Sequence, residues 1–214
     1  MNTSSTITRP RFARMYVKAA ARAERRGATE HRRRLLEGLS GRVVEVGAGH
    51  GLNFAHYPAT VTEVVAVEPE TTLRETARRA AAQAPVPVTV LEGTADLLPL
   101  GDGEADAVVV SLVLCSVPDQ AAALAEARRV LRPGGELRFY EHVIARCRPK
   151  RTILQLADHS GLWPKIAGGC HPARDTGAAI ESAGFTIERS ERFGFSASAL
   201  EPRVPHILGM ARRR

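Results

Sequence analysis

An acid and three glycines alternate in the short stretch Glu45-Val46-Gly47-Ala48-Gly49-His50-Gly51. Glycine allows the backbone to bend sharply and leaves no Cβ in the way of a ligand that lies on it. The stretch closes an apolar run, Val43 to Val46, that is typical of a buried strand. Glycines at the mouth of a first parallel strand indicate a nucleotide-type cradle. A tight strand-to-helix turn that binds nothing is the alternative, and we consider it the poorer explanation.

Two acids near the cradle distinguish between its candidate ligands. On glycine spacing alone, the ligand is either a dinucleotide or S-adenosylmethionine (SAM). Glu45 favours SAM, because its carboxylate can accept a hydrogen bond from the amino end of a methionine group and would repel a pyrophosphate. Glu68 ends the second predicted strand, about 20 residues beyond the glycines, where an acid is placed to hold ribose hydroxyls. Glu70 fits better as the cap of the next helix.

Potential metal ligands also gather later in the chain, at Asp158, His159, Cys170 and His171. Their spacing matches no standard zinc signature, and scattered polar groups of a loop explain them better. We therefore predict no metal site. Cys115 lies in an apolar run and is interpreted as a small core residue.

The cradle needs a sheet beneath it, and the apolar pattern predicts one. Runs that are apolar on both faces are typical of parallel strands covered by helices on both sides. Strands and helices alternate along the chain, which predicts an α/β doubly wound sheet. After the first strand, we expect strands at 61–67, 88–91, 105–111, 136–143, 185–192 and 206–212. Helices are expected at 52–56, 71–84, 120–131 and 175–183, with a short one around 153–158.

An arm and an insertion stand outside this alternation. Residues 1–8 are polar and predicted to be disordered. Residues 9–40 form a basic helical arm, with a break near Gly27 and Thr29 as a candidate N-cap. Residues 41–214 form the ligand-binding domain. It contains an irregular insertion at about 144–172, of the kind that often forms a lid or a substrate pocket.

Composition and charge argue against several classes of protein. The 214-residue chain is 44% hydrophobic but has no apolar run of about 18 residues, so no membrane-spanning helix is expected. Its polar start does not read as a signal peptide, and three widely spaced cysteines fit free thiols in a reducing cytoplasm. The formal charge is +7. Residues 9–34 alone carry +8, so the rest of the chain is close to neutral. Since nucleic-acid enzymes more often carry positive charge around the cleft, we expect a solvated cover helix in preference to a nucleic-acid or membrane contact.

With these residues in place, the chain resembles the class I SAM-dependent methyltransferases over almost its whole length. The motifs in order are the glycine stretch, Glu68, Ala95-Asp96-Leu97-Leu98-Pro99 and Leu131-Arg132-Pro133-Gly134-Gly135. A closer likeness is to animal methyltransferase-like proteins that methylate small alkyl thiols, and to their bacterial relatives. It rests on residues 51–58 and 112–117, Glu141-His142-Val143, Gly169-Cys170 and Pro205-His206-Ile207. The chain lacks the apolar N-terminal anchor of the animal proteins. The resemblance implies a Rossmann-like class I methyltransferase fold with a seven-stranded, mostly parallel sheet and helices on both faces.

The resemblance also implies a site for SAM, with S-adenosylhomocysteine as the product. The glycine stretch would pass beneath the methionine and ribose portions, and Glu68 would hold both ribose hydroxyls. Thr94 and Ala95 would lie by the adenine amino group, and Ser111 and Leu112 would flank the sulfonium. The implied cofactor-binding residues are Glu45, Gly47, Ala48, Gly49, Gly51, Asn53, Glu68, Pro69, Thr94, Ala95, Ser111 and Leu112.

The implied acceptor is a small, hydrophobic molecule, with a thiol favoured over an oxygen or nitrogen of a natural product. Transfer from a sulfonium is an in-line displacement that depends mainly on alignment in a dry pocket. A thiol with a pKa near 8.5 needs at most a modest base. Candidate bases are His142, Asp158 and His159, and each also has a structural explanation. His142 is preferred because the carboxyl ends of the strands face the cleft. Trp163, Phe193 and Phe195 are candidate walls of the acceptor pocket.

Three other functions remain to be weighed. A NAD-dependent oxidoreductase is disfavoured because the glycine loop lacks Gly-x-Gly-x-x-Gly spacing. A nucleic-acid methyltransferase that acts on amino groups would tend to show Asn/Asp-Pro-Pro-aromatic where Ser111-Leu112-Val113-Leu114 stands. A non-catalytic SAM-binding module stays open.

Overall fold

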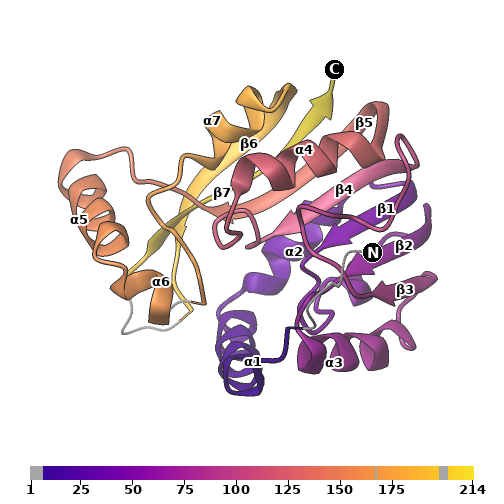
Figure 1. Cartoon of the computed structure of the whole chain (residues 1–214), viewed down its shortest axis with the longest axis horizontal. Coiled ribbons are helices and arrows are strands. Elements are labelled where there is room, and N and C mark those ends of the chain that lie inside the picture. The colour runs from indigo at the N-terminus through magenta and orange to yellow at the C-terminus, as the bar shows by residue number, and fades with distance from the viewer. Residues whose placement is uncertain (1–6, 167, 198–201) are drawn as a thin grey trace.

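The computed structural model describes residues 7–166, 168–197 and 202–214, which form one sheet with helices on both faces (Figure 1). The strand order is β3-β2-β1-β4-β5-β7-β6. The first five strands run parallel, and β7 is antiparallel to β5 and β6. The predicted Rossmann-like fold with a seven-stranded, mostly parallel sheet is confirmed. The strands are β1 (Gly41–Val46), β2 (Val61–Val67), β3 (Val88–Leu91), β4 (Ala105–Ser111), β5 (Leu131–His142), β6 (Phe185–Phe195) and β7 (Val204–Arg213).

Helices cover the sheet because successive side chains of each strand point to opposite faces. Val44 and Val46 of β1 pack in one core with α4 and α7, and Val43 packs in a second core with α2 and α3. The helices are α1 (Pro10–Arg25), α2 (Ala28–Leu36), α3 (Thr71–Ala81), α4 (Gln120–Val130), α5 (Arg148–His159), α6 (Leu162–Ile166) and α7 (Thr176–Ser182). In Figure 1, α5 and α6 stand beside the main body of the sheet. No helix in the described part of the chain is long and apolar enough to cross a membrane.

The N-terminal arm consists of α1 and α2, which are separated at Gly27 as the sequence predicts. Gly27 has a φ of 103°, a left-handed conformation that favours glycine, and it stands at the start of α2. Thr29 is not the N-cap, because its hydroxyl donates to Glu24 at the end of α1 instead. Of the predicted tail, residues 1–6 lie outside the described residues. The carbonyl of Ile7 accepts from Thr71 N at the start of α3.

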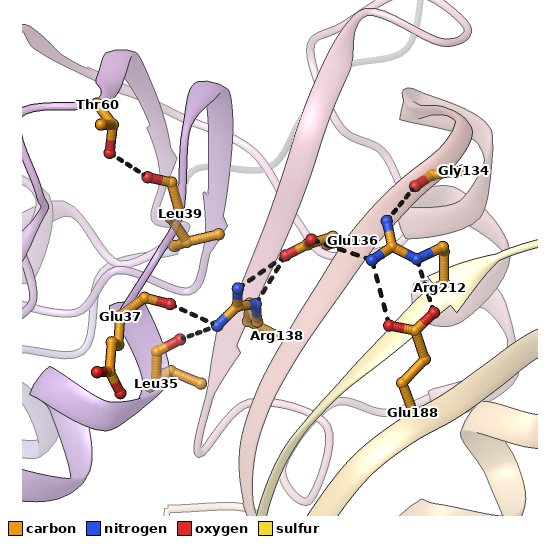
Figure 2. Close-up of polar contacts among 9 residues, drawn as sticks. All are labelled: Leu35, Glu37, Leu39, Thr60, Gly134, Glu136, Arg138, Glu188 and Arg212. Carbon is orange, nitrogen blue, oxygen red and sulfur yellow. Dashed lines mark hydrogen bonds and ion pairs between the residues drawn. The ribbon is translucent and has the colours of Figure 1, made fainter.

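A buried arginine attaches the arm to the sheet, as Figure 2 shows. Arg138 of β5 donates through Nη1 to the carbonyl of Glu37 (2.9 Å), just after α2, and its Nε and Nη2 contact Glu136. Because the last carbonyls of a helix have no partner within it, this guanidinium satisfies groups that would otherwise be buried and unpaired. Glu136 also meets Arg212 of β7, so one ionic cluster joins the arm to two strands.

Two predicted helices differ clearly from the structure. The helix expected at 52–56 is only a single 3-10 turn, Phe54–His56, because Tyr57-Pro58 follows at once and the residue before proline avoids the helical conformation. The helix of the insertion, expected around 153–158, extends from Arg148 to His159. Pro149 in its first turn accounts for the earlier start, because proline is well tolerated there.

Candidate functional site

The glycine loop after β1 is closely covered by side chains from other segments. Gly47 and Gly49 have φ values of 65° and 59°, so both positions favour glycine. A Cβ at Gly47 would lie 2.6 Å from Val113 Cγ2, and one at Gly49 would lie 3.0 Å from Tyr16 Oη. Tyr16 belongs to α1, so the arm lies directly on the loop. The loop therefore has both the backbone freedom and the neighbours expected of a cradle.

Glu68 lies at the carboxyl end of β2 and faces the glycine loop. Its carboxylate accepts hydrogen bonds from Gly49 N (2.8 Å) and Glu70 N (2.9 Å). Burial raises the pKa of Glu68 to about 7, although the two amide donors favour the charged form. Glu70 caps α3 by accepting from Leu73 N at 2.7 Å, as the sequence predicts. The carbonyl of Pro69, which lies between them, accepts a hydrogen bond from Arg74.

Glu45 and Asn53 form a buried network beneath the loop. The Glu45 carboxylate accepts from Asn53 Nδ2 (2.8 Å) and from Tyr57 Oη (2.7 Å). Arg32 of α2 donates to Asn53 Oδ1 (3.0 Å) and pairs with Glu24. Burial raises the pKa of Glu45 to about 7. Both oxygens of Glu45 are thus engaged by the protein, and the network links the arm to β1.

The carboxyl end of β4 carries a strained residue next to the loop. Leu112 has a φ of 60°, which is uncommon for a residue with a side chain and is often found at functional sites. Its N–H donates to the carbonyl of Tyr140 on β5 (2.7 Å). The hydroxyl of Ser111 is buried and has no protein partner within the described chain. Such a group is available to a ligand.

The segment after β3 holds the other two predicted cofactor residues. Thr94 forms an isolated bridge with Leu97, and Ala95 packs partly buried against the core. Both lie beyond β3, which β2 and β1 separate from β4 in the sheet order. The structure therefore places the predicted cofactor residues along the carboxyl ends of four adjacent parallel strands, which is where α/β folds of this type bind ligands.

Glu141 was not assigned a role from the sequence, yet it shapes the loop after β4. Its buried carboxylate accepts from the N–H groups of Val113 (2.9 Å), Leu114 (3.0 Å) and Cys115 (3.1 Å). Three donors on one carboxylate fix the path of the backbone there, and burial raises the pKa of this carboxyl well above its usual range. An acid in a strand gives no local signal for this role, because its partners are 26 to 28 positions away.

His142 lies at the carboxyl end of β5, between two cysteines from distant segments. Its Nδ1 is 3.2 Å from Cys170 Sγ and 3.5 Å from Cys115 Sγ. Contact with Cys170 and burial raise the pKa of the Cys115 thiol to about 12. The imidazole also packs against His206, with ring centroids 4.4 Å apart. The structure thus places His142 at the strand edge that the sequence predicts.

The other two candidate bases belong to α5 of the insertion. Asp158 contacts His171 Nδ1 at 2.7 Å, and His159 is exposed at the end of the helix. Both line a surface groove along α5 together with Thr152, Gln155, Leu156, His171 and Ala173. His171 N donates to the carbonyl of Cys115 (2.7 Å), so the Asp158–His171 pair is connected to the segment that carries Cys115. No contact of His142 with Asp158 or His159 is among the interactions of the described residues.

Aromatic rings gather around His206, the residue on which the His142 imidazole packs. Phe193 stacks on Tyr140 and on His206, with centroids 6.2 Å and 5.8 Å apart, and Phe195 meets His206 edge-on. His31 of α2 joins this cluster, 4.5 Å from Phe193, which the sequence did not predict. The rings form an apolar surface between the arm and β6. Trp163 is partly buried in α6 and makes none of the ring contacts of this cluster.

The chain is similar to known methyltransferases in both sequence and fold. The methyltransferase domain family matches residues 44–139. The human thiol S-methyltransferase TMT1B is 35% identical over 181 residues, which cover 82% of this chain and 73% of that protein. A SAM-dependent methyltransferase from Thermotoga maritima has a similar structure, with a TM-score of 0.69 at 23% identity, over 95% of this chain and 97% of that one. Geranyl diphosphate methyltransferase in complex with SAM gives a TM-score of 0.67 at 16% identity, over 87% and 84%.

Proposed function

The chain belongs to the same family of SAM-dependent methyltransferases as the thiol S-methyltransferases, and we propose that it methylates the sulfur of a small, hydrophobic thiol. It is an enzyme that uses SAM as its cofactor. The observation that carries the choice of a thiol is the 35% identity to TMT1B over most of both chains. Membership of this methyltransferase family argues against a NAD-dependent oxidoreductase and against a non-catalytic module.

We propose that the twelve predicted cofactor residues act in two groups. Gly47, Ala48, Gly49, Gly51 and Glu68 contact the cofactor, because the glycine loop and Glu68 lie at the carboxyl ends of two adjacent parallel strands and Glu68 keeps lone pairs beyond its two amide bonds. Ser111 and Leu112 flank the sulfonium, which is supported by the unpartnered hydroxyl and the strained backbone. Pro69, Thr94 and Ala95 border the adenosine.

Glu45 and Asn53 belong to the second group. Their polar side-chain atoms are engaged with Tyr57, Arg32 and each other. We therefore propose that they support the glycine loop from beneath, while backbone groups of the loop meet the methionine portion.

The acceptor side of the site is proposed to be the aromatic cluster next to His142. Methyl transfer removes the positive charge of the sulfonium, so a dry, apolar pocket that aligns the two sulfurs favours the reaction. Phe193, Phe195 and Tyr140 supply such a surface, and the insertion at 144–172 borders it through Cys170. His142 is the candidate base nearest this surface. Asp158 is already paired with His171, and His159 is exposed.

The arm and the cellular setting complete the proposal. We propose that residues 9–40 cover the cofactor loop through Tyr16. The proposed binding partner of the chain is a small molecule and not a nucleic acid. A peripheral membrane contact of the basic arm is the less favoured possibility. All three cysteines are free, which is consistent with the proposed cytoplasmic location.

The proposal is tested by measuring S-adenosylhomocysteine release from SAM with small alkyl thiols, phenols and amines offered one at a time. We expect turnover with thiols and an increase in kcat/KM with the length of the alkyl chain. A Phe193→Ala variant should lose that increase, because it removes part of the apolar surface. Turnover with phenols or amines but not thiols would refute the thiol assignment and leave the family and cofactor unchanged.

A further inference from the structure

Three potential metal-ligand atoms, two cysteine sulfurs and one histidine nitrogen, meet at the carboxyl end of β5. Cys115 Sγ, His142 Nδ1 and Cys170 Sγ all lie within 4.8 Å of one another, and no other group of three such ligands is found among the described residues. The two nitrogen–sulfur distances are 3.2 Å and 3.5 Å. Around a tetrahedral zinc ion with bonds of about 2.0 to 2.3 Å, neighbouring ligand atoms are about 3.5 to 3.8 Å apart. The two nitrogen–sulfur distances are close to this separation, and the two sulfur atoms lie within 4.8 Å of each other.

The three ligands are held by separate parts of the fold, which argues that their meeting is built into the structure. Glu141 fixes the N–H of Cys115, and His171 N holds the Cys115 carbonyl. Gly169, with a φ of 92°, lets the end of the insertion approach Ser116, where an added Cβ would lie 3.2 Å from the backbone oxygen. That approach brings Cys170 to His142. His142 itself is oriented by its packing on His206.

We propose that Cys115, His142 and Cys170 bind one thiophilic divalent cation, zinc in the first instance, and that its fourth position receives the acceptor thiol. Two thiolates and one imidazole are ligands that zinc prefers, and three protein ligands leave one tetrahedral position open. His142 is the partly exposed member of the set, and we place the open position on its side, toward His206 and the aromatic cluster. The second half of this inference rests on the proposed function.

The cation gives the thiol acceptor a chemical route that needs no strong base. On binding, the acceptor thiol releases its proton to solvent and becomes a thiolate at neutral pH. The thiolate electron pair forms the new carbon–sulfur bond as the bond from the methyl group to the SAM sulfonium breaks. The products are S-adenosylhomocysteine and a neutral thioether, which is a weaker ligand than the thiolate and leaves the cation.

The metal site is tested on the full chain, purified with a phosphine reductant, by elemental analysis and by zinc titration against a chromophoric chelator. We expect about one zinc per chain and a dissociation constant well below micromolar. Cys170→Ser should lower zinc affinity at least a hundredfold while leaving the far-UV spectrum unchanged. Cys147→Ser is the matched control, because Cys147 is exposed at the start of α5 and should retain the metal.

Several outcomes would overturn the inference. The reduced wild-type chain could fail to bind zinc more tightly than a micromolar chelator, or Cys147→Ser could lose as much metal as Cys170→Ser. A Cys115–Cys170 disulfide that persists in the reductant would also refute it. If Cys170→Ser does not fold, the wild type loaded with cobalt decides. Thiolate-to-cobalt absorption near 350 nm, with the intensity of two sulfur ligands, supports the site, and its absence refutes it.

The open position is tested separately with the cobalt form. Adding an alkyl thiol should increase the thiolate-to-cobalt absorption by about half, and an alcohol of the same length should not change it. An unchanged spectrum with full metal binding refutes the acceptor position but not the metal site. Methylation of thiols by a chain that binds no metal refutes the metal site but not the proposed function.

Discussion

Glu68 is the residue whose ionisation should control cofactor binding. Burial raises its pKa to about 7, whereas ribose hydroxyls that donate to it favour the carboxylate. SAM binding therefore lowers this pKa and releases a proton at pH 6. We expect SAM affinity to rise about tenfold from pH 6 to pH 8, most steeply below pH 7, and to level off above pH 8, as one pKa unit corresponds to about 1.4 kcal/mol. Calorimetric titration with SAM at several pH values, in two buffers, measures both quantities.

The variant Glu68→Gln separates this effect from other titrating groups. It removes a charged acceptor, so SAM should bind about 10 to 100 times more weakly at pH 8. Its affinity should also depend less on pH than that of the wild type. Glu75→Gln, on the exposed side of α3, is the control and should match the wild type. An unchanged affinity of Glu68→Gln would rule out the ribose contact.

Glu141 is expected to be a structural residue of the site. In Glu141→Ala, the N–H groups of Val113, Leu114 and Cys115 lose their common acceptor in a buried place. Each unpaired donor costs about 1 to 3 kcal/mol, so the free energy of unfolding should fall by about 3 kcal/mol or more. Urea unfolding measures it, and the exposed Glu188→Ala serves as control with a much smaller change. A loss no larger than that of the control would contradict the role.

The sequence predicts the roles of some of these residues and misses those of others. Glu68 and Glu70 could be placed because their roles follow from the end of a strand and the start of a helix, which are local features. Glu45 was predicted to lie near the amino end of the cofactor, and the structure adds two partners of its carboxylate, Asn53 and Tyr57, that were not predicted. The cluster of Cys115, His142 and Cys170 was missed because its members are 27 and 28 positions apart. Only the folded sheet and the insertion bring them together.

Among the elements, α2 depends on an arginine from the sheet. Arg138→Met keeps the apolar stem but leaves the carbonyl of Glu37 without its donor and reduces the contacts of Glu136 (Figure 2). We expect a loss of about 2 kcal/mol in unfolding free energy and faster amide exchange within α2, measured by mass spectrometry. Arg212→Met removes a more exposed partner of the same glutamate and should have a smaller effect on α2. Equal exchange in both variants would argue against the attachment.

The strands were predicted more accurately than the helices. The bounds at 61–67, 88–91 and 105–111 agree with β2, β3 and β4, because an apolar run between polar turns is a local signal. β5 begins earlier than expected, at Leu131, despite Pro133 and Gly134. Its first residue pairs with Ala105 across a register irregularity, which is a tertiary contact that no local pattern reports. The helix predicted at 52–56 was too long, because only the single turn Phe54–His56 forms.

At the scale of the whole molecule, the arm joins parts of the chain that are far apart in sequence. Phe12 packs against Gly168 of the insertion, Tyr16 lies on Gly49 of the cofactor loop, and Arg32 reaches Asn53. The basic side chains of α1 line the opposite, exposed surface, with Arg14 and Lys18 among them. The arm therefore has an inner face for the site and an outer face for solvent. Its net positive charge does not surround the cofactor loop.

This division predicts different effects of substitutions on the two faces of one helix. Phe12→Ala with Tyr16→Ala should open the site, weaken SAM binding about tenfold and raise the rate of S-adenosylhomocysteine dissociation, because the contact of Tyr16 with the glycine loop and that of Phe12 with the insertion are lost. Arg14→Ala with Lys18→Ala removes charge from the outer face and should leave both quantities unchanged. Stopped-flow fluorescence with SAM and S-adenosylhomocysteine measures the rates. If the outer pair weakened SAM binding as much as the inner pair, charge would outweigh coverage, and α1 would not be a cover of the site.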